Sequence, residues 1–224
     1  KLIKVWNIIT TFIYWLKIRL YNKQMIIESK YDILKQLPKK YLPKGTLIKG
    51  RLTPTKVENT LKELDIDYSF ILKPNYGERG RLVEKINSSK ELKNYLKKSK
   101  GALDFILQEY INQPLEVGIF YQRIPGEKKG KITSFISKEM LHVIGDGKST
   151  VKELMAKNTY TQIQLQEHPE RFSFILKDKP KKEELYLVAP IASHNRGTVF
   201  IDNQDKINNK LTTIIDNISK EVKG

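Results

Sequence analysis

The stretch Phe70-Ile-Leu-Lys-Pro-Asn-Tyr-Gly-Glu-Arg-Gly-Arg-Leu-Val-Glu-Lys-Ile86 says more about the fold of this 224-residue chain than any other part of it. Its first three residues, Phe70 to Leu72, are apolar and predict the end of a buried strand. Lys73 follows directly, and Gly77 and Gly80 then bracket a tight loop before a second short strand, which is predicted to begin at Leu82. The stretch therefore predicts a strand, a glycine loop and a returning strand.

This loop has the composition of a site for a polyphosphate. Glycine lets backbone N–H groups come close to phosphate oxygens, and the ammonium of Lys73 would supply the opposite charge. The loop is not a P-loop, because the pattern GxxxxGK(S/T) is missing and no helix is predicted after the glycines. Taken alone, the same residues are more typical of a hairpin turn on a basic surface, so the choice depends on the rest of the chain.

The amino-acid composition limits the classes of molecule that the protein could bind. Lys and Arg number 41 against 25 Asp and Glu, which gives a net charge of +16 and makes nucleic acid, an anionic membrane surface or a nucleotide polyphosphate the candidates. The chain contains no cysteine, which excludes disulfides and thiolate metal sites, and we expect a cytoplasmic protein. Its three histidines are widely spaced, which argues against a zinc site.

Residues 1–24 form the one strongly apolar stretch, with helical spacing of the large apolar side chains. Its uncharged part, between Lys4 and Lys17, is shorter than the roughly 20 residues that a membrane-spanning helix needs. We expect a helix that packs on the body of the protein or on a missing N-terminal part. The alternative is an interfacial helix that touches a membrane surface through Lys17, Arg19 and Lys23.

The remaining chain reads as hairpin strands mixed with helices, without regular βαβ alternation, and this pattern favours the α+β class. Capping boxes are predicted at Ser88–Glu91 and Thr150–Glu153, and helical spacing covers 206–222. Residues 158–184 give no assignment. The predicted division is an N-terminal helix, a small subdomain with the glycine loop and a larger subdomain, over residues 1–24, 25–100 and 101–224.

Several short motifs follow one another in a fixed order. They are Ser29-Lys30 at a helix start, the stretch from Phe70 to Ile86, Leu107 to Gly118 with its two carboxylates, and Ser137-Lys138. In this order they resemble the ATP-grasp superfamily, and most of all D-alanine–D-alanine ligases and the ATP-grasp part of cyanophycin synthetases. The turn at Gly145-Asp146-Gly147 is similar to the latter. The resemblance implies the ATP-grasp fold, in which two α+β subdomains clamp a nucleotide between them.

The resemblance also implies ATP as cofactor and a set of contacts to it. The matching positions are Lys30, Lys73, Gly77, Glu78, Arg79, Gly80, Glu109, Tyr110, Ile111, Glu116 and Lys138. The three lysines would neutralise phosphate oxygens, and the backbone of residues 76–80 would cover the β- and γ-phosphates. Glu109 with the backbone of Tyr110 and Ile111 would read the adenine, and Glu116 would accept from the ribose hydroxyls.

The activity that the resemblance implies is ATP-dependent ligation of a small carboxylate to an amine through an acyl phosphate. Arg196, in the polar loop from His194 to Thr198, is the candidate catalytic residue, although a plain surface arginine fits that position equally well. Magnesium is the expected second cofactor. Such ligases hold it with acidic residues after a helix like 206–222, and because the sequence ends there we assign no metal ligand and expect this stretch to be incomplete for catalysis.

A function of a different class is a basic nucleic-acid-binding module without catalytic activity. Lysines of the predicted helices 56–64 and 88–98 could contact a phosphate backbone, with Tyr68, Tyr76 and Tyr95 stacking on bases. Against this alternative, the lysines are scattered along the whole chain and no nucleic-acid-binding motif is recognisable.

Overall fold

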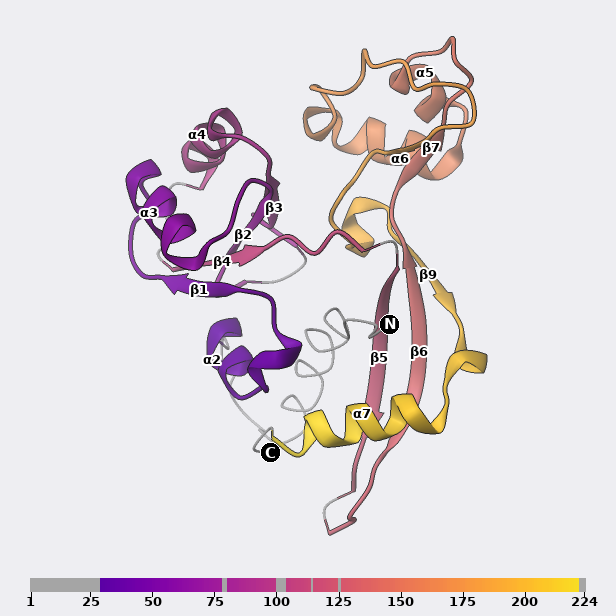
Figure 1. Ribbon diagram of the computed structural model, residues 1–224. Coiled ribbons are helices and arrows are strands. Elements are labelled where there is room, and N and C mark those ends of the chain that lie inside the picture. The colour runs from indigo at the N-terminus through magenta and orange to yellow at the C-terminus, as the bar shows by residue number, and fades with distance from the viewer. Residues whose placement is uncertain (1–28, 78–79, 100–103, 114, 125, 222–224) are drawn as a thin grey trace. The chain divides into compact units, whose positions relative to one another are not determined.

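The computed structural model describes residues 29–77, 80–99, 104–113, 115–124 and 126–221 (Figure 1). The helix predicted over residues 1–24 lies outside these ranges, as do Glu78 and Arg79 of the glycine loop. The chain divides into two compact units, the first formed by Lys1–Ser137 with Asp202–Gly224 and the second by Lys138–Ile201. Helices and antiparallel strand pairs occur together, which confirms the α+β class.

The first unit contains a four-stranded antiparallel sheet in the order β1-β4-β2-β3, whose strands are Gly45–Ile48, Phe105–Glu109, Phe70–Pro74 and Glu84–Ile86. The predicted strand, loop and returning strand are confirmed as β2 and β3, with Phe70 opposite Ile86. The strand β4 lies between β1 and β2, although it comes after residue 100. This sheet is therefore complete only with a strand from beyond the predicted subdomain boundary, which itself stays a prediction.

The second strand of the stretch begins two residues later than predicted, at Glu84 rather than Leu82. Leu82 has a φ of 56°, in the left-handed region that does not continue a strand. Its carbonyl accepts a hydrogen bond from the hydroxyl of Tyr95 at 2.7 Å. Leu82 thus belongs to the turn, and a contact with a helix later in the chain holds it there.

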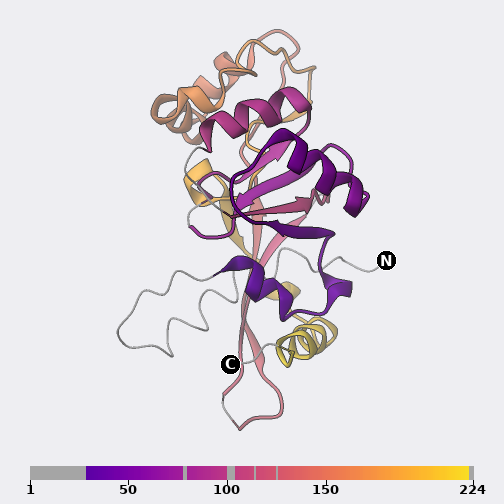
Figure 2. The same ribbon diagram turned by 90° about the vertical axis from the view of Figure 1, so that its left-hand side faces the viewer.

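Two helices, α3 (Pro54–Leu64) and α4 (Ser89–Lys98), cover one face of this sheet (Figure 2). Thr53 caps α3 by accepting from the N–H of Lys56, and proline takes the first helical position, where its missing N–H costs nothing. The capping box predicted at Ser88 is half right. The Ser88 hydroxyl accepts from Glu91, but the Glu91 carboxylate accepts from the N–H of Asn87 at 2.9 Å instead of closing on Ser88.

The core between helices and sheet is apolar and closely packed. Its innermost side chains point from alternate positions of the strands and from one stripe of each helix, as expected for a half-buried sheet under amphipathic helices. They are Ile48, Leu52, Val57, Leu61, Ile66, Phe70, Leu72, Ile86, Leu92, Tyr95, Phe105 and Leu107. This packing fixes which residues of β2 and β4 face the opposite side.

A second core of the same unit joins α2 (Lys30–Lys35), β5 (Glu116–Gln122), β6 (Lys131–Glu139) and α7 (Asn209–Ser219), and α7 crosses β5 and β6 (Figure 1). The strands β5, β6 and β9 (Val199–Asp202) form a sheet in that order. Asp216 of α7 fastens the helix to the hairpin. It accepts hydrogen bonds from the Tyr121 hydroxyl and from the Gly130 N–H, the latter at 3.1 Å.

The second unit contains β7 (His142–Ile144) paired with β8 (Leu185–Leu187), and the helices α5 (Val151–Ala156) and α6 (Thr159–Glu167). The helix α6 falls in the region without an assignment, because its apolar spacing is weak and the polar Thr161 and Gln164 face inward. Single 3₁₀ turns are η1 (Lys39–Tyr41), η2 (Pro169–Arg171), η3 (His194–Arg196) and η4 (Gln204–Lys206). Within the ranges that the structure describes, no helix has the length and apolar character to cross a membrane.

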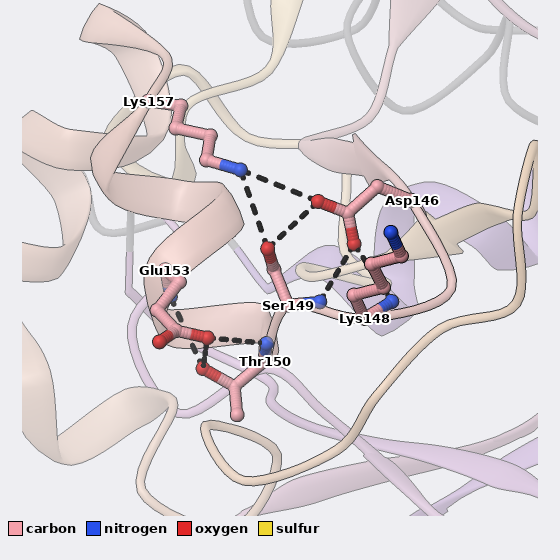
Figure 3. Close-up of polar contacts among 6 residues, drawn as sticks. All are labelled: Asp146, Lys148, Ser149, Thr150, Glu153 and Lys157. Atoms are coloured by element: carbon pink, nitrogen blue, oxygen red, sulfur yellow. Dashed lines mark hydrogen bonds and ion pairs between the residues drawn. The ribbon is translucent and has the colours of Figure 1, made fainter.

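The turn at Gly145–Gly147 leads into α5 through a set of local hydrogen bonds (Figure 3). Asp146 accepts from the N–H groups of Lys148 and Ser149 at 2.9 and 2.6 Å and from the Ser149 hydroxyl at 2.7 Å, and these bonds hold the pKa of its carboxyl well below the usual range. The capping box predicted at Thr150 and Glu153 is confirmed. Residues close in sequence make all of these contacts.

We expect the Thr150→Ala variant to lose about 0.5–2 kcal/mol of stability, the usual effect of removing a helix N-cap hydroxyl. The Thr150 hydroxyl accepts from the Glu153 N–H at 3.3 Å, and alanine cannot replace it. Chemical denaturation followed by circular dichroism measures the loss. Thr159→Ala is the matched control, since Thr159 is an exposed threonine in the first turn of α6 and Asn158 caps that helix. Equal losses in the two variants would contradict the role of Thr150.

Candidate functional site

The sheet face opposite α3 and α4 carries two lysines, Lys73 of β2 and Lys85 of β3; we call it the lysine face. The register places Ile71 opposite both Lys85 and Gln108, so these three residues share this side of the sheet. Lys73 lies opposite Ile106, which makes Gln108 its diagonal neighbour. The Lys73 ammonium donates to the side-chain oxygen of Gln108 at 2.7 Å.

Lys30, the first residue of α2, reaches the start of the glycine loop. Its ammonium donates to the carbonyl oxygens of Pro74, Asn75 and Gly77 at 3.2, 3.4 and 2.6 Å. The helix begins here because the Ser29 hydroxyl accepts from the Asp32 N–H at 3.1 Å. The structure thus brings Lys30 to the loop that follows Lys73.

Asn75 holds this arrangement together, and sequence reasoning missed it. Its side chain is only 1% exposed; its Oδ1 accepts from the Tyr31 N–H at 2.9 Å, and its Nδ2 donates to the Ser29 hydroxyl at 3.0 Å. The backbone of Asn75 accepts from the Lys30 N–H at 3.1 Å. A polar residue directly after a buried strand was the available signal, because a buried amide must find hydrogen-bond partners.

The electrostatics of the lysine face favour an anion. Burial and, to a smaller extent, the nearby positive charge of Lys30 together lower the pKa of Lys73 to about 8. The partner that Lys73 does have, Gln108, is a neutral amide, so the contact leaves the ammonium charge uncompensated. A phosphate placed beside Lys30 and Lys73 would relieve their repulsion.

The glycine loop turns as the sequence predicts. Gly77 and Gly80 have φ values of 119° and 68°, a region that residues with a Cβ rarely adopt. The N–H of Val83 donates to the carbonyl of Gly80 at 3.2 Å and closes the turn before β3. The assignments of Glu78 and Arg79 to the phosphates lie outside the described residues and stay predictions.

The residues predicted to read adenine lie at the end of β4. Glu109 accepts from the backbone N–H of Lys44 at 3.2 Å through one carboxylate oxygen, and its own N–H donates to the Lys44 carbonyl at 2.9 Å. The carbonyl of Ile111 accepts from the Gln113 N–H at 3.1 Å, so the chain turns directly after the strand. The adenine contacts of Glu109, Tyr110 and Ile111 stay predictions.

Tyr110 is joined to the lysine face. The Lys85 ammonium lies 3.9 Å from the centre of the Tyr110 ring, a cation–π contact. Burial raises the pKa of Tyr110, and the negative charge of Glu116 adds to the rise. Glu116, predicted for the ribose, is therefore near Tyr110, and Lys85 is a further basic residue on the lysine face.

Lys138 and Arg196 belong to the second unit. Lys138 lies near the end of β6, and Arg196 closes the 3₁₀ turn η3 before Gly197, whose φ is 81°. Arg171 supports this turn by donating to the carbonyl of Asn195 at 3.1 Å. The predicted roles of Lys138 at the phosphates and of Arg196 in catalysis stay predictions.

One part of the nucleic-acid alternative is wrong. Tyr95 was expected to stack on bases, but it is 4% exposed and its hydroxyl donates to the Leu82 carbonyl, because it completes the core under α4. Burial raises the pKa of its hydroxyl, and the charge of Glu84 adds to this. Tyr68 and Tyr76 are 36% and 44% exposed, so two of the three predicted rings are accessible to bases.

In the part of the chain that the structure describes, no group of three or more His, Asp or Glu side chains is placed so that it could hold a metal ion. Magnesium commonly takes one or two carboxylates and completes its shell with water and substrate phosphates.

Comparison with known proteins gives one family match. Residues 14–118 match the sequence profile of the tubulin-tyrosine ligase family, which covers under half of the chain. The matched range contains Lys30, Lys73, the glycine loop, Glu109 and Glu116. A comparison with curated protein sequences finds no match.

Two solved structures are similar over much of this chain. A bifunctional glutathione synthetase from Pasteurella multocida has 15% identity and a TM-score of 0.37, over 88% of this chain and 28% of that one. A carboxyaminoimidazole ribonucleotide synthase from Asperigillus clavatus, complexed with ATP, has 13% identity and a TM-score of 0.42, over 72% and 43%. The chain thus spans less than half the length of either protein, and TM-scores this low do not assign a fold.

Proposed function

We propose that this chain is the ATP-binding portion of an ATP-dependent ligase of the ATP-grasp superfamily. The observation that carries the proposal is the convergence of Lys30 and Lys73, from separate elements, on the start of one glycine loop. Two ammonium groups next to close-packed backbone suit a polyphosphate better than any other small anion, because its charge is spread over adjacent groups.

The family match supports the same conclusion from the sequence side. The tubulin-tyrosine ligase family is itself ATP-grasp-like, and its match to residues 14–118 covers every predicted nucleotide contact before Lys138. The nearer resemblance to D-alanine–D-alanine ligases and cyanophycin synthetases is a proposal that rests on the motif order. Glu109 with Tyr110 and Ile111 would bind the adenine, and Glu116 the ribose.

The reaction that we propose is ligation of a carboxylate to an amine. A carboxylate oxygen attacks the γ-phosphorus of ATP, the bond from that phosphorus to the bridging oxygen of the β-phosphate breaks, ADP leaves, and an acyl phosphate is formed. The amine nitrogen then attacks the acyl carbon, phosphate leaves, and the amine loses a proton. In this reaction the chain would hold ATP and neutralise its charge through Lys30, Lys73 and Lys138. Arg196 is the candidate residue for binding the transferred phosphate or the acceptor substrate.

Magnesium would enter this site with the phosphates of ATP, where it supplies further neutralisation of charge. We also propose that the substrates are a small carboxylate and an amine-bearing molecule, and that the protein is cytoplasmic. Each is an inference from the resemblance and from composition. The basic net charge of +16 fits a nucleotide polyphosphate without requiring nucleic acid.

Calorimetric titration with ATP tests the proposal. We expect ATP to bind the protein, and the Lys73→Ala variant to bind it about 10- to 100-fold more weakly, because a hydrogen bond to a charged group contributes about 1.5–3 kcal/mol. Lys93→Ala is the matched control, since Lys93 is an exposed lysine on α4, away from the lysine face. We expect the control to bind ATP as tightly as the unaltered protein.

Thermal melting followed by circular dichroism shows whether the Lys73→Ala variant is folded. If a folded Lys73→Ala variant bound ATP as tightly as the unaltered protein, the result would contradict the proposal. A gel-shift titration with RNA separates the other class of function. Strong RNA binding that weakens with salt, together with no effect of ATP, would favour the nucleic-acid alternative.

A further inference from the structure

The side chain of Gln108 stands out among the residues of β4. The strand reads Phe105-Ile106-Leu107 before it, and all three are buried, so an apolar residue would be the ordinary choice at position 108 as well. Gln108 is nevertheless 6% exposed, and its Oε1 accepts from the Lys73 ammonium at 2.7 Å. A buried amide is costly unless it is hydrogen-bonded, which indicates that this contact is the purpose of the residue.

We propose that Gln108 is a positioning residue that holds the Lys73 ammonium beside the glycine loop while leaving its charge available to an anion. The proposal rests on the proposed function, because it assigns a role at the same phosphate site. It adds a residue that neither the motif order nor the family match singles out.

The chemistry of the amide explains why glutamine suits this task. A glutamate at 108 would form an ion pair with Lys73, which would compete with a phosphate for the ammonium. A leucine would leave the ammonium without its acceptor and free to turn away from the loop. An amide oxygen accepts the hydrogen bond and adds no net charge, so it orients the ammonium without neutralising it.

The other charged groups on the Lys73 side of the sheet are also positive. Lys30 approaches from α2, and its charge favours the neutral form of Lys73. Lys85 lies on the same face from β3, while its neighbour Glu84, opposite Leu72, points to the other face. The group that β4 presents to Lys73 is the neutral Gln108. The site is therefore predominantly cationic, and the Lys73 charge depends on pH near 8.

The test compares Gln108→Glu and Gln108→Leu with the unaltered protein. The pKa of Lys73 is read first in ATP-free protein, from the NMR shift of its side-chain carbon next to the ammonium, assigned with Lys73→Ala. We expect Gln108→Glu to raise this pKa and Gln108→Leu to lower it, because a carboxylate favours the ammonium and loss of the acceptor disfavours it. Gln122→Glu, at an exposed position of β5, should leave the pKa unchanged.

ATP titration of the same variants is the second readout. We expect about a tenfold loss of affinity in Gln108→Glu at pH 7, and in Gln108→Leu a loss of affinity that sets in at lower pH than in the unaltered protein. If Gln108→Glu does not fold, Gln108→Leu carries the test, since its side chain is close to glutamine in size and apolar like its neighbours.

The outcomes for the two proposals are separable. A Lys73 pKa that stays the same in folded Gln108→Leu and Gln108→Glu would overturn the role of Gln108, whatever ATP does. Absence of ATP binding by the unaltered protein would contradict the proposed function instead, and the ATP-free measurement would still decide whether Gln108 controls Lys73.

Discussion

Replacing Asp216 with alanine is expected to lower the free energy of unfolding by about 3–5 kcal/mol. Asp216 is 6% exposed and accepts hydrogen bonds from the Tyr121 hydroxyl and the Gly130 N–H, and the variant loses both of these bonds. Its contact with the Lys220 ammonium at 2.6 Å adds less, because Lys220 is half-exposed and water screens the pair. The buried hydrogen bonds therefore dominate the effect.

Urea denaturation followed by circular dichroism measures this change, with Asp205→Ala as control. Asp205 is an exposed acid in the 3₁₀ turn just before α7, and we expect its removal to change stability by less than about 0.5 kcal/mol. If Asp216→Ala were as mild as Asp205→Ala, α7 would not depend on this anchor.

Asp216 is also expected to make the stability of the protein depend on pH in the acid range. Burial by itself would raise the pKa of Asp216, but the hydrogen bonds from Lys220, Tyr121 and Gly130 outweigh burial and lower the pKa to about 2. A carboxyl whose folded pKa lies below its unfolded value stabilises the protein above pH 4 and loses that contribution as the pH falls towards 2. Asp216→Asn should remove this part of the acid sensitivity, and an unchanged acid profile would contradict it.

ATP affinity is expected to fall about 10- to 100-fold between pH 7 and pH 10, which is the loss that deletion of the Lys73 ammonium should cause. The pKa of Lys73 is about 8, so Lys73 is largely charged at pH 7 and largely neutral at pH 10. Only the ammonium form attracts phosphate oxygens. Calorimetry at several pH values, in buffers with different ionisation enthalpies, would also detect proton uptake when ATP binds near pH 8.

Lys73→Arg is the control for this pH dependence, because a guanidinium stays charged throughout the range. We expect the ATP affinity of that variant, whatever its absolute value, to change little between pH 7 and pH 9. If the unaltered protein bound ATP with the same affinity at every pH, the Lys73 charge would not contribute to binding.

The stability of the protein should rise with pH while the ATP affinity falls. Because the pKa of Lys73 is lowered in the folded state, the folded state gains stability as the pH rises from 8.

Local features of this fold could be predicted well. The strand, glycine loop and strand of residues 70–86 and the capping box at Thr150 depend on residues close to them in the sequence. These features follow from short-range sterics and hydrogen bonding, which the sequence states directly.

Other features depended on partners far along the chain. Tyr95 turns inward, and its hydroxyl donates to the Leu82 carbonyl, 13 positions earlier in the chain. The buried residues of helix α6 are the polar Thr161 and Gln164, so the apolar periodicity of the sequence did not predict this helix. In each case packing against another element decided between local conformations of similar energy.

The sequence by itself determined the α+β class, the turn chemistry of the loop and the presence of lysines suited to phosphate. Only the tertiary structure decided that Asn75 joins α2 to the end of β2 and that Gln108 holds Lys73. The physical reason is that the sheet register and the position of α2 bring these residues together across gaps of 35 to 47 positions. Burial there leaves a polar side chain dependent on whichever partner the fold supplies.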